Sequence, residues 1–159
     1  MKIKTAFLDT PIGTVKITGD ENGIQTISII DEKVDDKQEI HECLQNCVQQ
    51  LKDYFQGKRT DFELTVNPKG TAFQIKVWKS LLQIPYGKTT NYLAQSVLLG
   101  DKKAIRAVAS ANGKNPILIV IPCHRVLGSD GSLTGFSAGI WRKKWLLAHE
   151  NPVKQETLF

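Results

Sequence analysis

The period of the apolar residues changes near residue 67, and this change limits the chain to a fold in two parts. In the first part apolar and polar residues alternate, as they do in short strands with one buried face. The strands predicted in this way cover residues 3–8, 14–18 and 24–30. Turn signals at residues 10–13 and 21–23, the second containing Asn22-Gly23, predict hairpin connections between them. After residue 67 apolar residues recur at helical spacing, so we predict an α/β subdomain over 1–66 and a mainly helical one over 67–150.

A helix over about 38–55 and a further strand over 60–66 complete the predicted first part. Gly57 follows the helix as a stop signal. The apolar face of this helix consists of Leu44, Val48, Leu51 and Phe55. Cys43 and Cys47 lie one helical turn apart, with His41 nearby, but a fourth metal ligand is missing. We therefore predict no metal site there and no cofactor.

The second part is predicted to contain a helix-turn-helix. A capping box, Thr71-x-x-Gln74, opens its first helix, whose apolar stripe is Phe73, Val77, Trp78, Leu81 and Leu82. Two short helices follow, over about 91–98 and from Asp101 to residue 111 or 112, with Gly100 between them. Two helices around such a turn are typical of DNA-binding proteins, although the pattern also occurs in others.

The helix after Asp101 carries two features that favour contact with DNA. Lys102 and Lys103 lie in its first turn, where the helix dipole disfavours cations but where phosphates of DNA are attracted. One face of the helix has small side chains except for the long cation Arg106. Its other residues are Ala109, Ser110 and Gly113. A face of small side chains suits the narrow minor groove, and Arg106 can then enter the base stack. Close packing against a neighbouring helix is the alternative, but Ala104, Ile105, Val108 and Ala111 already supply a packing face.

The net charge of the chain changes sign near residue 67, where the apolar pattern also changes. Residues 1–66 hold eight Lys/Arg and twelve Asp/Glu, a net charge of −4, whereas residues 67–150 hold twelve Lys/Arg and three Asp/Glu, a net charge of +9. A basic part joined to an acidic one is consistent with a nucleic-acid face, and equally with uneven surface charge. Three cysteines without disulfide spacing, and an N-terminus too short in apolar residues for a signal peptide, predict a cytosolic protein that does not enter a membrane.

A proline-bounded apolar run, residues 117–121, is predicted to be a buried strand that delivers Cys123. Pro122 fixes the approach, and His124 and Arg125 follow the cysteine. A thiol beside histidine and cations has surroundings that favour the nucleophilic thiolate. An inert buried thiol is the alternative, and these residues alone favour it.

The run Ile121–Val126 resembles the active-site signature of the O6-alkylguanine-DNA alkyltransferases, also called methylated-DNA–protein-cysteine methyltransferases. The resemblance extends without a gap from Thr71 to Glu150, and is looser in the first part. The matching segments are Gly70–Gln74, Val77-Trp78, Ile84–Gly87, Tyr92, Arg106–Val108, Asn115-Pro116, Gly135–Ser137 and Trp145–Glu150. The resemblance implies a ribonuclease-H-like α/β subdomain followed by a helical, winged-helix-like subdomain with the helix-turn-helix.

The resemblance also implies a reaction centred on Cys123. This thiol would take the alkyl group from O6-alkylguanine, and from O4-alkylthymine, in double-stranded DNA, and would keep it as a thioether. His124 would activate the thiol through a water, and Glu150 would orient the imidazole. A bridging water is needed because adjacent side chains on an extended backbone point apart. The damaged base must leave the helix stack before a sulfur can reach it in line.

Other residues acquire roles in binding DNA from the same resemblance. Arg106 would fill the space left by the flipped base, and Tyr92 would donate to the guanine ring and displace its 3′ phosphate. Asn115 would hold the loop that carries the cysteine. Backbone groups near Cys123, Val126 and Ser137 would line the base pocket.

Three departures from the family pattern bear on rate and alkyl-group range, and none changes Cys123. Phe136 stands where many relatives have tyrosine, so a hydroxyl is missing from the pocket. Asn91 replaces a usual serine. Gln95-Ser96 replaces a usual Leu-Ala in the first of the paired helices.

The tail, residues 151–159, is predicted to be an exposed flexible strip because Pro152 ends the preceding helix. Gln155, Leu158 and Phe159 resemble the short peptide by which bacterial polymerases and repair proteins bind the sliding clamp. Folding of the two apolar residues onto the protein itself is the alternative, and five residues make a weak motif.

Two other classes of function are open to such a chain. A DNA-binding regulator with Cys123 as a sensor would be expected to carry a second DNA-binding domain, for which this length leaves no room. A cysteine hydrolase usually takes its histidine from far along the chain, not from the adjacent position, and would have no use for the basic helix.

Overall fold

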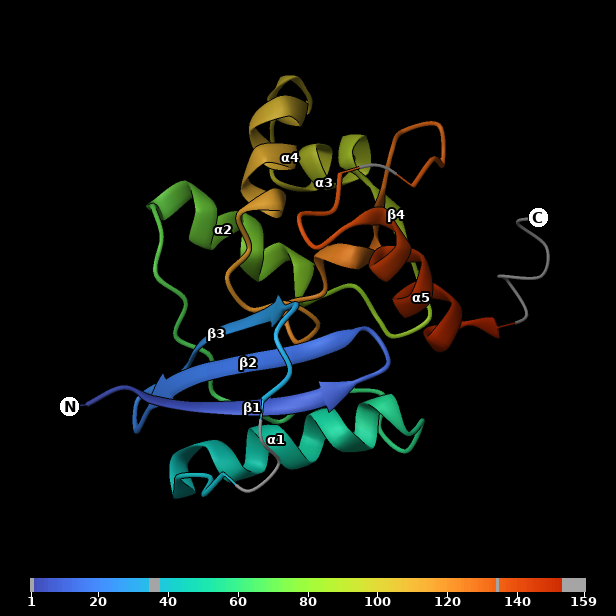
Figure 1. The fold of residues 1–159 in the computed structure, drawn as a ribbon. Coiled ribbons are helices and arrows are strands. Elements are labelled where there is room, and N and C mark those ends of the chain that lie inside the picture. The colour runs from blue at the N-terminus through green and yellow to red at the C-terminus, as the bar shows by residue number, and fades with distance from the viewer. Residues whose placement is uncertain (1, 35–37, 134, 153–159) are drawn as a thin grey trace. The chain divides into compact units, whose positions relative to one another are not determined.

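The computed structural model describes residues 2–34, 38–133 and 135–152 of the chain (Figure 1). They belong to two compact units. The first unit runs from the N-terminus to Lys69 and also includes Pro116–Leu118. The second unit holds Gly70–Asn115 and the residues from Ile119 onward. Nothing in the sequence pattern had indicated that the chain returns to the first unit at residues 116–118.

An antiparallel sheet frames the first unit, with the strands in the order β1 (Lys4–Thr10), β2 (Gly13–Asp20) and β3 (Gly23–Ile30) (Figure 1). Both predicted hairpins are confirmed, because Thr10 pairs with Gly13 and Asp20 pairs with Gly23. The second turn requires glycine: Gly23 has a φ of +135°, and a Cβ there would lie 2.8 Å from the carbonyl oxygen of Thr65.

Helix α1 (Glu42–Phe55) runs across one face of this sheet and contacts all three strands (Figure 1). Its buried face includes the predicted Leu44, Val48 and Leu51, together with Cys47 and Tyr54. Gly57 follows the helix in the left-handed region, as its position predicted, with a φ of +76°.

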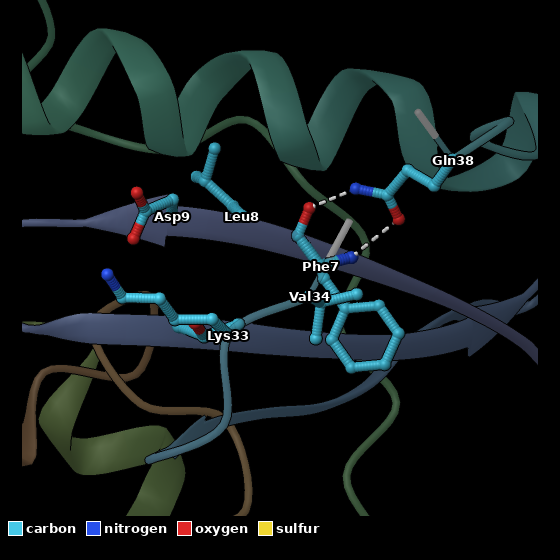
Figure 2. Close-up of a pocket in the computed structure, with 7 residues that line it drawn as sticks. Phe7, Leu8, Asp9, Lys33, Val34 and Gln38 are labelled. Atoms are coloured by element: carbon cyan, nitrogen blue, oxygen red, sulfur yellow. Dashed lines mark hydrogen bonds between the residues drawn. The ribbon is translucent and has the colours of Figure 1, made fainter. Parts of the chain in front are cut away.

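The prediction that α1 begins near Gln38 was wrong, because Gln38 pairs with the edge strand β1 instead. The Phe7 N–H donates to Gln38 Oε1 at 2.9 Å, and Gln38 Nε2 donates to the Phe7 carbonyl oxygen. Figure 2 shows this amide standing where the next strand of a sheet would place a peptide group, at the side of a cavity of about 260 Å³. His41 is the residue that caps α1, since its ring accepts from the Cys43 N–H at 3.2 Å.

Two predicted strands do not form. Residues 60–66 contain only an isolated bridge, between Val66 and Ile24. In the apolar run 117–121, Ile117 bridges Ile27 and the Leu118 N–H donates to the Ile27 carbonyl oxygen at 3.0 Å, after which the chain turns. Ile119 lies in this turn with a φ of +72°, which is rare for a β-branched residue. The run is buried, as predicted, but it is not a strand.

The second unit begins with α2 (Ala72–Leu81). Its predicted capping box is confirmed: Thr71 Oγ1 accepts from the Gln74 N–H at 3.1 Å, and Gln74 Oε1 accepts from the Thr71 N–H at 2.9 Å. Val77, Trp78 and Leu81 are buried as predicted. Phe73 and Leu82 were wrongly assigned to the buried stripe, because they are 42% and 48% exposed.

The helix-turn-helix consists of α3 (Tyr92–Leu98) and α4 (Ile105–Gly113), which contact each other. Helix α4 also packs on α2, and Gln95 of α3 hydrogen-bonds to Ser80 of α2. Asn91 caps α3 by accepting from the Ala94 N–H at 2.8 Å. The helix predicted from Asp101 starts as a separate 3₁₀ turn, η1 (Lys102–Ala104), whose cap is the Asp101 carboxylate. The α-helix itself therefore starts at Ile105, and it continues through Gly113.

Three further elements surround the Cys123 segment. Strand β4 (Thr90–Asn91) pairs in parallel with β5 (Val126–Leu127), and a 3₁₀ turn, η2 (Cys123–Arg125), precedes β5. Helix α5 (Ile140–Glu150) contacts η2. Among the described helices, none is long and apolar enough to cross a bilayer.

Candidate active site

Cys123 begins the turn η2, directly after Pro122, and is only 6% exposed. The extended backbone predicted for Cys123 and His124 was wrong. Successive residues of a 3₁₀ helix are nevertheless about 120° apart, so their side chains still leave the backbone in different directions. The pairing of Thr90 with Val126 and of Asn91 with Leu127 fixes the end of this segment beside the start of α3.

A buried charge cluster connects η2 to the end of α5. His124 Nε2 lies 2.7 Å from Glu150 Oε2. Arg125 Nε donates to Glu150 Oε1 at 2.8 Å, and its Nη2 donates to Oε2 at 3.1 Å. Arg125 Nη1 donates to the Ile84 carbonyl oxygen at 2.6 Å. One carboxylate therefore holds both side chains that follow Cys123.

Glu150 fixes the tautomer of His124. Burial acts to raise the pKa of Glu150, but its hydrogen bonds with His124 and Arg125 outweigh this and hold the pKa well below its usual range. An ionised carboxylate can only accept, so His124 Nε2 carries the hydrogen. Burial lowers the pKa of His124, against the opposing effect of Glu150, so the imidazole is neutral. Its Nδ1 is then a free base, and it is buried without a hydrogen-bond partner among the described residues.

The thiol of Cys123 has Asn115, Lys143 and Tyr92 among its polar neighbours. Burial raises the pKa of Cys123, while the Asn115 side chain and the charge of Lys143 oppose the increase. Asn115 also donates from Nδ2 to the Ile121 carbonyl oxygen at 2.7 Å, and so ties down the segment before the cysteine. The thiol is therefore protonated at rest, and has a cation and an amide nearby that favour the thiolate.

The sequence did not lead us to predict a role for Lys143, although the residue pattern of α5 indicates that it is buried. It shares the buried stripe of that helix with Leu146 and Glu150, at helical spacing. Its Nζ donates to the Val126 carbonyl oxygen at 2.6 Å, and burial lowers its pKa to about 8. Arg125 was quoted within the signature but given no role, and its ion pair with Glu150 could not be read from adjacency to Cys123.

The residues expected to receive the base lie on β5, α3 and the loop before α5. Tyr92 is 8% exposed, and its hydroxyl lies 3.5 Å from the carbonyl oxygen of Gly135, to which it donates. Burial and the neighbouring Cys123 raise the pKa of Tyr92, so its hydroxyl keeps its hydrogen. Val126 is fully buried, Phe136 is 9% exposed and Ser137 is exposed.

The α4 surface has the expected two faces. Val108 and Ala111 are buried, whereas Ala104 and Ile105 are only partly buried. Residues on the other face are accessible: Arg106, Ser110 and Gly113 are exposed, Ala109 is half-buried, and Lys102 and Lys103 on η1 are exposed. The Arg106 side chain makes no hydrogen bond or ion pair with any residue that the structure describes.

The structure does not gather Cys43, Cys47 and His41 into one cluster. The Cys43 sulfur lies 3.1 Å from His41 Nδ1, while Cys47 faces the core of the first unit. Within residues 2–34, 38–133 and 135–152, no group of three or more His, Cys, Asp or Glu side chains is placed to hold a metal ion.

Comparison with known proteins gives matches over both units. Residues 72–152 match the family model for the DNA-binding domain of 6-O-methylguanine DNA methyltransferase, and residues 3–68 match the model for its ribonuclease-like domain. A methylated-DNA–protein-cysteine methyltransferase of Methanosarcina barkeri is 42% identical over 91% of this chain and 94% of its own length. The crystal structure of the Mycobacterium tuberculosis O6-methylguanine methyltransferase superposes with a TM-score of 0.85 at 37% identity, over 95% of this chain and 94% of that one. A crystal structure of the M. tuberculosis protein in complex with DNA gives a TM-score of 0.83 at 39% identity, over 92% of this chain and 91% of that one.

Proposed function

Because the chain belongs to the methylated-DNA–protein-cysteine methyltransferase family, we propose that it repairs alkylated DNA by moving the alkyl group onto Cys123. The observation that carries this proposal is a buried thiol at Cys123, followed in the chain by a neutral His124 whose Nε2 is hydrogen-bonded to the Glu150 carboxylate. The substrate is O6-alkylguanine in double-stranded DNA, with O4-alkylthymine as a second substrate.

The neutral His124 and the protonated thiol suit a step that begins with proton transfer. The S–H proton of Cys123 passes through a bridging water to His124 Nδ1, and Glu150 stabilises the imidazolium that results. The thiolate then forms a bond to the alkyl carbon while the bond from that carbon to O6 breaks. The electron pair stays with the guanine, which takes up one proton to become neutral, while the imidazolium releases the proton that came from the thiol, so that no net proton is gained or lost. Tyr92, which keeps its hydroxyl hydrogen, donates to the guanine ring during this change.

Lys143 supports the same step electrostatically. Its ammonium favours the thiolate of Cys123 over the thiol, and its contact with the Val126 carbonyl oxygen orients the backbone beside the cysteine. Val126, Phe136 and Ser137 line the base pocket, in which Phe136 offers a ring without a hydroxyl. Asn115 holds the preceding segment in place through Ile121.

The surface of η1 and α4 binds the DNA that carries the damaged base. Lys102 and Lys103 contact phosphates, while Ala109 and Ser110 approach the minor groove. Arg106 has no partner among the described residues and extends from the small face of α4. It takes the place of the flipped base, which offsets part of the cost of unstacking.

Each molecule acts once, because a thioether is not reversed by cellular thiols. The test is incubation with an oligonucleotide that carries one O6-methylguanine, followed by intact mass measurement and peptide mapping. The expected result is one added methyl, on Cys123, with product never exceeding protein in moles, and no transfer by Cys123→Ser. Multiple turnovers, or a methyl on Cys43 or Cys47, would contradict the mechanism.

The three free cysteines are consistent with a protein of the cytosol, where thiols stay reduced.

A sliding clamp is a further partner that we propose from the sequence of the tail. Residues 153–159 lie outside the described residues, so Gln155, Leu158 and Phe159 are judged on their pattern alone. Apolar anchors entering a preformed groove would tether the protein to newly copied DNA and raise its local concentration there. Calorimetry with the clamp of the same organism tests this: micromolar binding that Leu158→Ala/Phe159→Ala abolishes is expected, and no heat at high concentration rules the contact out.

A further inference from the structure

Three polar side chains are buried together between the helices of the second unit. Gln95 of α3 and Asn112 of α4 are each 3% exposed, and Ser80 of α2 is 9% exposed. Gln95 Nε2 donates to Asn112 Oδ1 at 3.1 Å, and Asn112 Nδ2 donates back to Gln95 Oε1 at 2.7 Å. Gln95 Nε2 also donates to Ser80 Oγ at 3.2 Å, and the Ser80 hydroxyl donates to the Val77 carbonyl oxygen at 2.6 Å.

The two amides form a reciprocal pair, each donating to the other. Such a pair has good geometry at only one relative slide and rotation of the two helices, because hydrogen bonds weaken quickly with misalignment. Contacts between apolar surfaces are far less directional. The Gln95–Asn112 pair therefore sets the register of α4 against α3 in a way that side-chain burial alone does not.

Helix α4 depends on this pair because its apolar anchor is small. Its buried residues are Val108, Ala111 and Asn112, so one of the three is an amide. The other polar anchor is the Trp78 Nε1–H, which donates to the Ala111 carbonyl oxygen at 2.8 Å. Both anchors lie in the last turns of the helix. Arg106 is six residues before Asn112, which corresponds to about 9 Å along a helix axis, so a small rotation at the anchor displaces Arg106.

We propose that the Gln95–Asn112 amide pair, supported by Ser80, is a positioning element that holds α4 so that Arg106 enters the DNA at the depth base flipping requires. This inference rests on the proposed function and extends it to residues that touch neither DNA nor the reacting atoms. Displacements of about 1 Å can cost roughly a hundredfold in rate when a group must fit a reacting complex. A buried polar pair at a helix–helix contact is also a known means of fixing register.

The decisive variant is Gln95→Met/Asn112→Leu, which removes both amides together and keeps side chains of similar size. Replacing both partners by apolar groups leaves no amide unpaired, so the protein is expected to fold with equal or higher thermal stability. Single-turnover methyl transfer from duplex DNA is expected to slow by about tenfold or more, while reaction with free O6-benzylguanine base stays within about twofold. The swapped variant Gln95→Asn/Asn112→Gln keeps the amide pair and the summed side-chain length, and is expected to recover most of the duplex rate. Gln50→Met removes a buried amide from the first unit and serves as the matched control.

Hydrogen exchange of the α4 backbone provides a readout that does not depend on alkyl transfer. In the apolar variant, exchange over Ile105–Gly113 is expected to accelerate about tenfold relative to α2, and not in Gln50→Met. Failure of the wild-type protein to react with either substrate would refute the proposed function. The exchange data would still test whether the amide pair holds α4 in place. A folded apolar variant with unchanged duplex rate, or with unchanged exchange in α4, overturns the proposal. Equal losses on duplex and free base overturn it as well, because the pair would then support the Cys123 site instead of α4.

Discussion

Lys143 and Glu150 bring opposite charges into the same buried region of the second unit, and each acts on a different residue of the Cys123 segment. The charge of Lys143 acts on the thiol, since it opposes the increase in the pKa of Cys123 that burial causes. Glu150 forms hydrogen bonds with the His124 imidazole and with Arg125. Removing either charge should therefore have a distinct signature.

Lys143→Met should slow alkyl transfer to duplex DNA and to free base alike. The substitution keeps the length of the side chain but removes the charge that favours the thiolate, and one unit of thiol pKa corresponds to about a tenfold change in thiolate population. Burial lowers the pKa of Lys143 to about 8, so the advantage of the wild type should be largest below pH 8 and shrink above it. Single-turnover rates from pH 6 to 9 measure this, with Lys144→Met as the control for loss of a neighbouring exposed cation. Equal rates for Lys143→Met and wild type at pH 7 would contradict the assigned role.

The same lysine should make stability depend on pH in alkaline solution. Its folded-state pKa of about 8 lies below the value of 10.5 that it has when unfolded. Between these two values the unfolded chain binds the additional proton, so the free energy of unfolding should rise with pH across this window. Urea unfolding at a series of pH values checks this as a difference between wild type and Lys143→Met. A difference that stays constant from pH 7.5 to 10 would show that Lys143 is not the group responsible.

Glu150→Gln should destabilise the protein as well as impair transfer. The amide leaves Arg125 as a buried cation without its carboxylate, and breaking a buried ion pair from one side costs roughly 3–5 kcal/mol. The amide can donate as well as accept and carries no charge, so it no longer fixes the hydrogen of His124 on Nε2 or stabilises the imidazolium, and reaction with the free base should slow together with duplex repair. Thermal unfolding and single-turnover rates of the same preparation test both effects. A variant of normal stability and rate would show that the relay does not depend on the carboxylate.

These residues also mark how far a sequence could predict the site. Cys123, His124 and Glu150 were assigned by resemblance to a signature, and the structure brings the last two within hydrogen-bond distance. Arg125 and Lys143 acquire these partners only when α5 folds against the Cys123 segment. Arg125 and its partner Glu150 are 25 residues apart along the chain, and Lys143 and its partner Val126 are 17 residues apart. Such pairings are tertiary, and local patterns carry no direct information on them.

Among the elements, the start of α2 and the extent of α3 were predicted well because they are coded locally. The Thr71–Gln74 capping box and the Asn91 cap each need only residues within one turn. The apolar run 117–121 was misread because burial makes a strand and a buried turn look alike in sequence. Its real conformation depends on the Ile117–Ile27 bridge and on Ile119 in the left-handed region, neither of which a run of apolar residues reveals.

Helix α4 provides the prediction at the scale of an element. Arg106→Ala should slow repair in duplex DNA far more than reaction with free O6-benzylguanine, because only the duplex has a base stack to fill. Unstacking costs a few kcal/mol, so loss of a finger that offsets part of it should reduce the duplex rate by about tenfold or more. Lys114→Ala, which removes an exposed cation just after α4, is the matched control. Equal losses on the two substrates would show that Arg106 supports the fold and not base flipping.

At the scale of the whole chain, the separation of charge distinguishes two sources of affinity for DNA. Residues 1–66 are acidic and residues 67–150 are strongly basic, so the net charge of +5 understates the field of the second part. If affinity came from net charge, any lysine would contribute equally. If it comes from phosphate contacts on η1, only the lysines there should contribute to the release of counterions.

The salt dependence of binding to undamaged duplex DNA separates these two sources. The logarithm of the binding constant should fall linearly with the logarithm of salt concentration, with a slope of about −0.9 for each phosphate contacted. Lys102→Gln and Lys103→Gln should each reduce the magnitude of this slope by about 1, since both side chains are exposed on η1. Lys16→Gln, which removes the same charge from β2 in the acidic part, should leave the slope unchanged. Fluorescence anisotropy from 50 to 300 mM salt measures all three. Equal changes in slope for Lys16→Gln and Lys102→Gln would assign the affinity to net charge. They would also contradict the proposal that the lysines of η1 contact phosphates.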